Sequence, residues 1–265
     1  LLDWLAVEFR ESGWSLKHVH RLIVTSSVYR QSSAFREQLT KVDPTNILLA
    51  RQSRRRVEAE VIRDLALHAS NLLSEKIGGP SVRPPQPTEY SSLTYANSAK
   101  WETSGGEDKY RRGLYTFFQR TSPYPMLVTF DAPDSTACVA VRQTSNTPLQ
   151  ALTIWNDPVF VECAQALGRR IMAENPAGND VEQTDKSRIR YAVLACLSRR
   201  PTPQEQQALM EYYQGQRRLL AENPEAATKI IGSLPVAEGS ELAELAAWVV
   251  VGRVILNLDE FINKE

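Results

Sequence analysis

The segment that most constrains the fold lies near the C-terminus. Residues 240–258 include the run LAAWVVV at 245–251 and are apolar on nearly every side of a helix. A helix that is apolar all round has to be surrounded by other parts of the protein. The run stops at Gly252, well short of the roughly 20 residues that a membrane-spanning helix needs. We therefore expect Ser240 to cap the central, most buried helix of a helical domain, and we expect no membrane span.

The N-terminal residues predict two short helices that form a hairpin. Leu2, Leu5 and Phe9 recur at helical spacing. Gly13 followed by Trp14 is typical of a left-handed helix stop with an apolar residue that folds back over the last turn. A cap at position 15 then starts the second helix, so that residues 1–28 form the hairpin.

Further helices are predicted along the rest of the chain. After a turn at 43–46, apolar spacing predicts a long helix through Leu72. Helix starts are also indicated by Asp157-Pro158, by the capping box at 202–205 and by Asn223-Pro224.

The middle of the chain has a different amino-acid composition and pattern. Prolines follow one another from Pro80 to Pro87, and a polar run continues to Gly106 with no sustained periodicity. Loops of this length are usually functional or disordered. Next to it, LYTFFQ at 114–119 and MLVTF at 126–130 predict the two strands of a small hairpin.

Together these signals predict a mainly α fold. We expect a compact multi-helix domain of about ten helices, with one small β-hairpin and a long proline-rich loop. A single domain over 1–265 would comprise a helical part (1–78), the loop and hairpin (79–130) and a second helical part (131–265). The first residues lack the features of a signal peptide and start directly in a helix, which favours a C-terminal part of a longer parent chain.

Charge and cysteine content exclude several classes of protein. The chain has 31 Lys and Arg and 31 Asp and Glu, so the basic balance of a nucleic-acid binder is missing. Its three cysteines lie far apart, with no pair suited to c-type haem attachment or to a disulfide framework. No haem or other cofactor is therefore indicated in this chain.

The densest set of candidate catalytic residues lies in residues 130–156. On a helix starting at Asp131, the side chains of Asp131, Asp134 and Cys138 would share one face. Two carboxylates there could perform acid–base chemistry or hold a divalent cation. In the alternative interpretation, Asp131 is a helix cap, Asp134 favours the first turn and Cys138 is a small buried residue.

Other polar and aromatic residues are candidates for binding. Arg142 is a further catalytic candidate, and Asn146, Gln150 and Asn156 could grip a ligand or tie loop backbone together. Trp101, on the long loop, could stack against a sugar ring or pack onto its own domain.

A charge cluster precedes the loop. It comprises Arg55, Arg56, Glu60, Arg63 and Asp64. Opposite charges three and four residues apart support a helix. A second interpretation is that several of these charges lie inside and order the long loop, since an arginine paired with a carboxylate fixes geometry.

Long blocks of the chain resemble one family in family order. The chain is similar to the uncharacterised C-terminal domain, of the PSD type, of planctomycete cytochrome-c-associated multi-domain proteins. The segments that carry the resemblance are residues 1–33, 43–64, 78–87, 110–134, 146–162 and 256–265. Where the family has an arginine-rich stretch, this chain reads VRQTS at 141–145 and keeps Arg142 alone.

The resemblance implies a non-catalytic or partner domain of an exported protein. Its partners would be other domains of the parent protein, a c-type cytochrome or substrate-handling module among them, in the periplasm or cell envelope. A carbohydrate-active enzyme that uses Asp131 and Asp134, or a carbohydrate-binding module, is the alternative.

Overall fold

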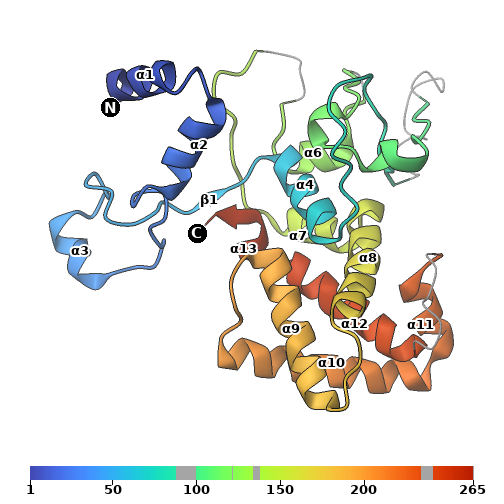
Figure 1. Cartoon of the computed structure of the whole chain (residues 1–265). Coiled ribbons are helices and arrows are strands. Elements are labelled where there is room, and N and C mark those ends of the chain that lie inside the picture. Colours follow the sequence, from blue (N-terminus) through green and yellow to red (C-terminus); the bar gives the residue numbers. More distant parts are fainter. Residues whose placement is uncertain (88–99, 121, 134–137, 234–240, 265) are drawn as a thin grey trace. The chain divides into compact units, whose positions relative to one another are not determined.

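The computed structural model describes residues 1–87, 100–120, 122–133, 138–233 and 241–264 (Figure 1). The chain forms two compact units. Unit 1 comprises Leu1–Arg56 and Asn263–Glu265, and unit 2 comprises Val57–Ile262. The described residues contain 12 α-helices and one two-stranded antiparallel sheet, so the predicted mainly α fold class is confirmed. The predicted extent of one domain over 1–265 stays a prediction.

Unit 1 begins with the helical hairpin expected from the sequence. Helix α1 (Leu2–Glu11) ends where Gly13 and Trp14 take positive φ angles of 70° and 61°. The Trp14 ring returns to contact Phe9 edge-on, with ring centroids 5.2 Å apart. Ser15 then caps helix α2 (Leu16–Thr25) by accepting the backbone N–H of His18. The predicted helix stop and cap are both present.

The rest of unit 1 differs from the prediction. The long helix expected after residue 46 starts later: α3 (Glu37–Val42) comes first, and α4 of unit 2 spans Ala59–Ala69. Strand β1 (Arg55–Arg56) lies between them and pairs antiparallel with β2 (Asn263–Lys264). Helical spacing failed here because the strand's partner comes from the other end of the sequence, which no local pattern reveals.

The core of unit 2 is built on two contacting helices, α8 (Pro158–Glu174) and α12 (Leu242–Leu256). As predicted, α12 is buried almost all round, and Trp248 at its middle is fully covered. The predicted cap Ser240 lies outside the described residues. Gly168 lets the helices approach closely, since a Cβ there would lie 2.8 Å from the backbone nitrogen of Val249. No helix among the described residues is both long and apolar enough to cross a membrane.

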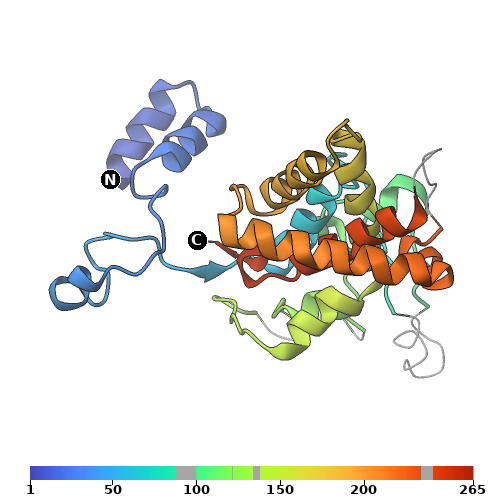
Figure 2. The same cartoon turned by 90° about the horizontal axis from the view of Figure 1, so that it is seen from below.

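Four more helices of unit 2 complete this part. They are α9 (Val181–Leu197), α10 (Pro203–Glu222), α11 (Pro224–Ile231) and α13 (Asp259–Ile262). Helix α10 runs alongside α12, as Figure 2 shows. The capping box predicted at Thr202 is present, because its hydroxyl accepts the N–H of Glu205 and the Glu205 carboxylate accepts the N–H of Thr202.

The hairpin predicted between residues 114 and 130 is not formed there. Residues Gly113–Tyr115 form the 3-10 helix η3, which follows η2 (Gly106–Tyr110), and Pro125–Thr129 form helix α6. Proline at the first position of α6 favours a helix start over a strand. The extended residues near 116 instead pair with the proline-rich segment, where Phe117 donates to the carbonyl of Val82 at 2.7 Å.

Candidate functional site

Asp131 is used to close a loop. Helix α6 ends at Thr129, and Asp131 has a left-handed backbone with φ 62°, so no helix begins there. Its carboxylate accepts the N–H of Ser145 at 2.8 Å and the Ser145 hydroxyl at 2.9 Å. The expected helix face is therefore not formed at Asp131. Cys138 is exposed and has a free thiol, and Asp134 lies outside the described residues.

Gln150 and Ser145 link this closure to the next helix, α7 (Pro148–Asn156). Gln150 is buried, and its amide donates to the carbonyl of Thr129 at 3.0 Å and to Ser145 Oγ at 3.1 Å. Its oxygen accepts the N–H of Thr147, which completes a capping box. The polar groups of this segment are thus directed to one another and to backbone.

Arg142 pairs with two glutamates of the α4 region. Its guanidinium holds Glu60 through two contacts of 2.7 and 3.1 Å and reaches Glu58 at 3.1 Å. Burial alone would raise the pKa of Glu60, but the hydrogen bond from Arg142 and its charge bring that pKa below the usual value. Arg142 therefore fixes the segment after Asp131 to the start of α4.

Arg63, which is buried, and Asp64, which is half-buried, order the region that follows the long loop. Arg63 is 0% exposed and donates to the main-chain carbonyls of Lys109 (2.7 Å) and Arg111. Asp64 accepts the N–H of Gly113 at 2.6 Å. Burial raises the pKa of Asp64, although that hydrogen bond acts in the opposite direction. Arg55 and Arg56 form strand β1 and belong to unit 1, whereas Arg63 and Asp64 belong to unit 2. The predicted charge cluster is therefore divided between the two units.

A second buried arginine, Arg111, was not singled out by sequence reasoning. It donates to the carbonyls of Pro80 and Gly78, and its guanidinium lies over the Tyr115 ring. The only sequence signal for it is the pair of arginines before Gly113. Because arginines are mostly exposed to solvent, this pair did not indicate a buried residue.

Trp101 packs onto its own domain. Its indole N–H donates to the carbonyl of Pro84 at 2.6 Å, and its ring stacks on Tyr124 with centroids 5.5 Å apart. Tyr124 in turn donates to the carbonyl of Pro85 at 2.7 Å. The aromatic pair holds the proline-rich segment in place, and one face of the Trp101 ring is covered by Tyr124.

A cleft of about 360 Å³ lies where α6 and α7 meet the end of the proline-rich segment. Asn156, one of the predicted binding residues, lines it, whereas Asn146 makes an exposed contact of 3.4 Å with Asp259. Leu149, Leu152 and Met126 give the cleft an apolar wall.

Asp157 also lines this cleft. The sequence identified it only as a helix cap, and its carboxylate does accept the N–H of Val159 at 2.9 Å. Burial raises the pKa of Asp157 to about 6. This group therefore titrates in a range where most carboxylates are fully ionised.

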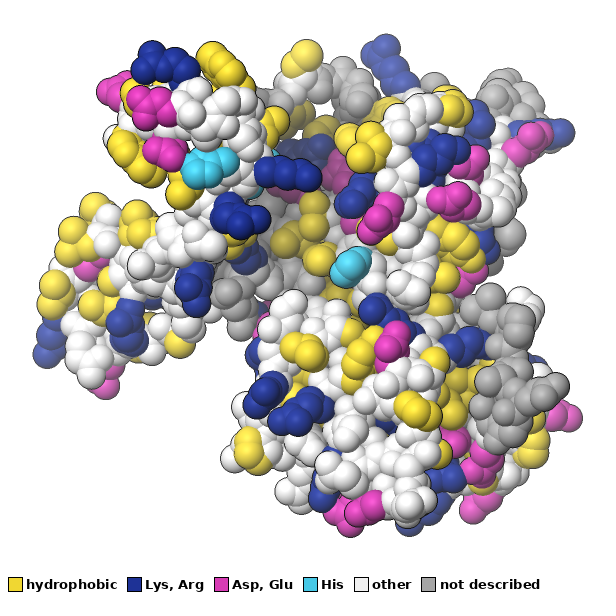
Figure 3. All heavy atoms as spheres, in the orientation of Figure 1, with side chains coloured by type: hydrophobic (Ala, Val, Ile, Leu, Met, Phe, Trp, Pro, Cys, Tyr) yellow, Lys and Arg dark blue, Asp and Glu magenta, His cyan; other side chains and the backbone are white. Residues whose placement is uncertain are grey.

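Unit 1 has an unusual distribution of apolar side chains. In the described part of residues 1–56, Asp43 alone is buried, and it accepts the N–H groups of Ile47 and Leu48. The exposed large apolar side chains are Leu1, Leu2, Trp4, Val7, Trp14, Leu16, Ile23, Val24, Val28, Tyr29, Phe35, Val42, Ile47, Leu48 and Leu49. Figure 3 shows hydrophobic side chains on the surface over α1 and around α3.

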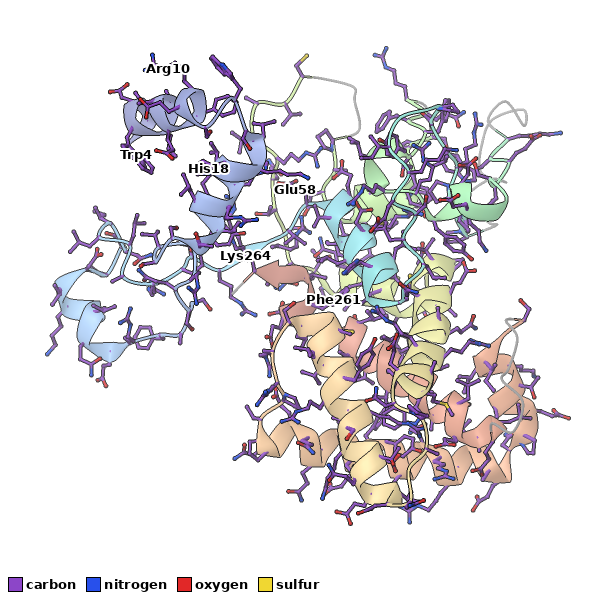
Figure 4. All side chains as sticks on the ribbon, in the orientation of Figure 1. Trp4, Arg10, His18, Glu58, Phe261 and Lys264 are labelled. Atoms are coloured by element: carbon purple, nitrogen blue, oxygen red, sulfur yellow. The ribbon has the colours of Figure 1, made fainter. Side chains whose placement is uncertain are left out.

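The exposed apolar side chains of unit 1 are substantially open to solvent. Leu2 is 81% exposed and Trp4 is 54% exposed. Trp4 and Arg10 lie on opposite sides of α1, while His18 faces α1 from α2 and contacts Glu8 at 2.7 Å (Figure 4). Unit 1 is also basic, since its 11 Lys and Arg outnumber its 6 Asp and Glu, giving a net charge of +5 in a chain of zero net charge.

A metal centre receives no support from the described ranges. There, no three His, Cys, Asp or Glu side chains gather closely enough to hold an ion. The divalent cation considered beside Asp131 and Asp134 stays a prediction, because Asp134 lies outside those ranges.

Comparison with known proteins gives a family. The family model PSD1, described as a protein of unknown function (DUF1553), matches residues 1–213. No curated protein and no solved structure matches the chain.

Proposed function

Because the chain belongs to the PSD1 family of proteins of unknown function, we propose that it is a non-catalytic docking domain that binds a neighbouring folded domain through unit 1. The observation that carries this proposal is that the described part of residues 1–56 buries no apolar side chain. Many exposed apolar side chains within one short segment are typical of an interaction surface.

The energetics of unit 1 support the proposal. Each large apolar side chain contributes about 1.5–3 kcal/mol when it moves from water to a buried position. Helices as short as α1 and α2, 10 residues each, are marginal in water unless an apolar face is packed. A covering surface would therefore stabilise the hairpin as well as bind it.

The chemistry of the partner follows from the charge of unit 1. A net charge of +5 around apolar side chains favours a partner with an apolar patch and an acidic rim. We propose that this partner is another domain of the same polypeptide, the redox or substrate-handling module implied by the family resemblance, in the periplasm or cell envelope.

The use of the polar candidates supports a non-catalytic role. Asp131 accepts from Ser145, Glu60 pairs with Arg142, and Asp64 accepts from Gly113. A catalytic carboxylate needs to face a substrate rather than neighbouring backbone. The carbohydrate-active enzyme thus has no specific observation in its favour.

Hydrogen exchange of the backbone amides tests the docking proposal. The 265-residue chain is compared with the same chain expressed together with its flanking domains. We expect the amides of α1 and α2 to exchange at least about tenfold more slowly in the longer protein. Full protection in the 265-residue chain alone would overturn the proposal, because the apolar side chains would then be covered without another domain.

Matched substitutions make the test specific. The pair Trp4→Asp and Leu16→Asp removes apolar surface from unit 1, whereas Leu114→Asp changes an apolar residue of unit 2 that is even more exposed. We expect the first pair to abolish the extra protection and Leu114→Asp to preserve it. Equal effects of both changes, or a homodimer of the 265-residue chain in light scattering, would contradict docking onto a neighbouring domain.

A further inference from the structure

A second cleft of unit 2, separate from the residues discussed above, is lined by α9, α10 and the start of α12. Its volume is about 480 Å³, within the range of small-molecule sites. Asp185 and Tyr213 lie in its lining and are both buried, while Arg217, Arg218, Gln214 and Glu241 are more accessible. The family match ends at residue 213, so five of the eight residues that line this cleft lie beyond it.

Tyr213 carries an unsatisfied polar group. The residue is 1% exposed, its ring stacks on Trp248 with centroids 4.2 Å apart, and its hydroxyl has no hydrogen-bond partner among the described residues. An unpaired buried hydroxyl costs about 1–3 kcal/mol. Such groups in native proteins usually have a ligand or water as their partner.

Asp185 is a second group with unused hydrogen-bonding capacity. The structure places its nearest cationic partner, Arg188, at 3.7 Å, beyond hydrogen-bond distance, and Arg188 instead binds Glu244 at 2.6 Å. Burial raises the pKa of Asp185, while the charge of Arg188 opposes that shift. The carboxylate can therefore accept a hydrogen bond from a group entering the cleft.

The charges around the cleft cancel. The lining holds two guanidinium groups, of Arg217 and Arg218, and two carboxylates, of Asp185 and Glu241, and Arg217 pairs with Glu241 at 2.5 Å. The lining therefore has no net charge that would favour an anion or a cation, and a neutral ligand suits it.

We propose that this cleft binds a small neutral polyhydroxyl compound of the mono- or disaccharide class. A hydroxyl group both donates and accepts, so one ligand can donate to Asp185, accept from the guanidinium of Arg218 and pair with the Tyr213 hydroxyl. Amides can also do this, but they offer fewer such groups for their size. The site is independent of the docking surface on unit 1.

Ligand-observed NMR and titration calorimetry on the full 265-residue chain test the proposal, with D-glucose, D-galactose and maltose as probes. We expect at least one of them to bind. Tyr213→Phe, which removes only the hydroxyl, should weaken that binding about five- to tenfold. Tyr212→Phe removes a phenol from the same helix outside the cleft lining and should leave affinity within about twofold.

Two further measurements decide between outcomes. Arg218→Ala changes an exposed residue that the fold does not require, and it should also weaken binding, so the proposal stays testable even where Tyr213→Phe alters folding. Inorganic phosphate, glycine and acetamide serve as charged, zwitterionic and amide probes. Absence of saccharide binding, equal effects of the two tyrosine variants, or tighter binding of any of these three probes would overturn the proposal.

Discussion

The carboxylate of Asp64 accepts the backbone N–H of Gly113 at 2.6 Å, which fixes helix α4 to the segment that follows the long loop. Next to this contact, Gly113 approaches so closely that an added Cβ would lie 2.8 Å from Cα of Glu60. Arg63 binds the same segment from inside. The order of the whole region therefore depends on a few side chains of α4.

Replacing Arg63 by Met should destabilise unit 2 by at least about 2 kcal/mol. The change leaves the buried carbonyls of Lys109 and Arg111 without that donor, and an unsatisfied buried group costs about 1–3 kcal/mol. Urea unfolding monitored by circular dichroism measures the loss. Arg112→Met, at an exposed position, is the control and should change stability by less than about 0.5 kcal/mol. Equal effects of the two substitutions would contradict the assigned role.

Two glycine substitutions in helices should have opposite signs. Gly168→Ala places a methyl group 2.8 Å from Val249 and should cost about 1–3 kcal/mol through overpacking. Gly215→Ala, in α10, meets nothing within 4 Å and should stabilise by about 0.5–1 kcal/mol through helix propensity. Thermal unfolding of both variants checks the pair. A neutral Gly168→Ala variant would mean that α8 and α12 are farther apart than described.

The stability of unit 2 should fall as pH rises from about 4 to 7 because of Asp157. Its pKa is about 6 in the folded state and 3.8 ordinarily, so the folded state binds the proton more tightly. The contribution is complete below the unfolded pKa and is lost as pH rises through the folded pKa, with a magnitude of about 2–3 kcal/mol. The difference in free energy of unfolding between wild type and Asp157→Asn, which retains a capping side chain, should shift by that amount over this range. A pH-independent difference would rule out the raised pKa.

Asp131→Ala should destabilise unit 2 more than Asp131→Asn does. Both remove the charge, but Asn can still accept from Ser145 and tolerates the positive φ of this position. We expect a gap of about 1 kcal/mol between the two variants in chemical denaturation. If the variants were equally stable, the hydrogen bonds to Ser145 would not contribute to stability.

The sequence identified the helices that local signals specify. The stop at Gly13, the cap at Ser15 and the box at Thr202 depend on neighbouring residues alone, and all three were found. The apolar run at 245–251 also identified the central helix. These features arise from interactions within a few residues, which a single sequence displays.

Long-range pairing and exposure could not be read in the same way. Strand β1 depends on a partner strand at the other end of the sequence, because Arg55 pairs with Lys264 and Arg56 pairs with Asn263. The Tyr213 hydroxyl has no hydrogen-bond partner among the described residues because of the way the helices pack around it. The residues next to Tyr213 in the sequence do not reveal this. Asp131 was predicted to start a helix for the same reason, because the contact of its carboxylate with Ser145 is not visible in the residues next to it.

The pairing of β1 with β2 has a consequence for the order of folding. Val57 donates to the carbonyl of Ile262 at 2.9 Å, so the entry and exit of unit 2 meet at one point, and the strand pair continues directly from it. Two residues per strand are too few to offset the entropy of closing so long a loop. The two strands should therefore pair only after unit 2 has folded and brought its ends together. On heating, they should separate before unit 2 unfolds.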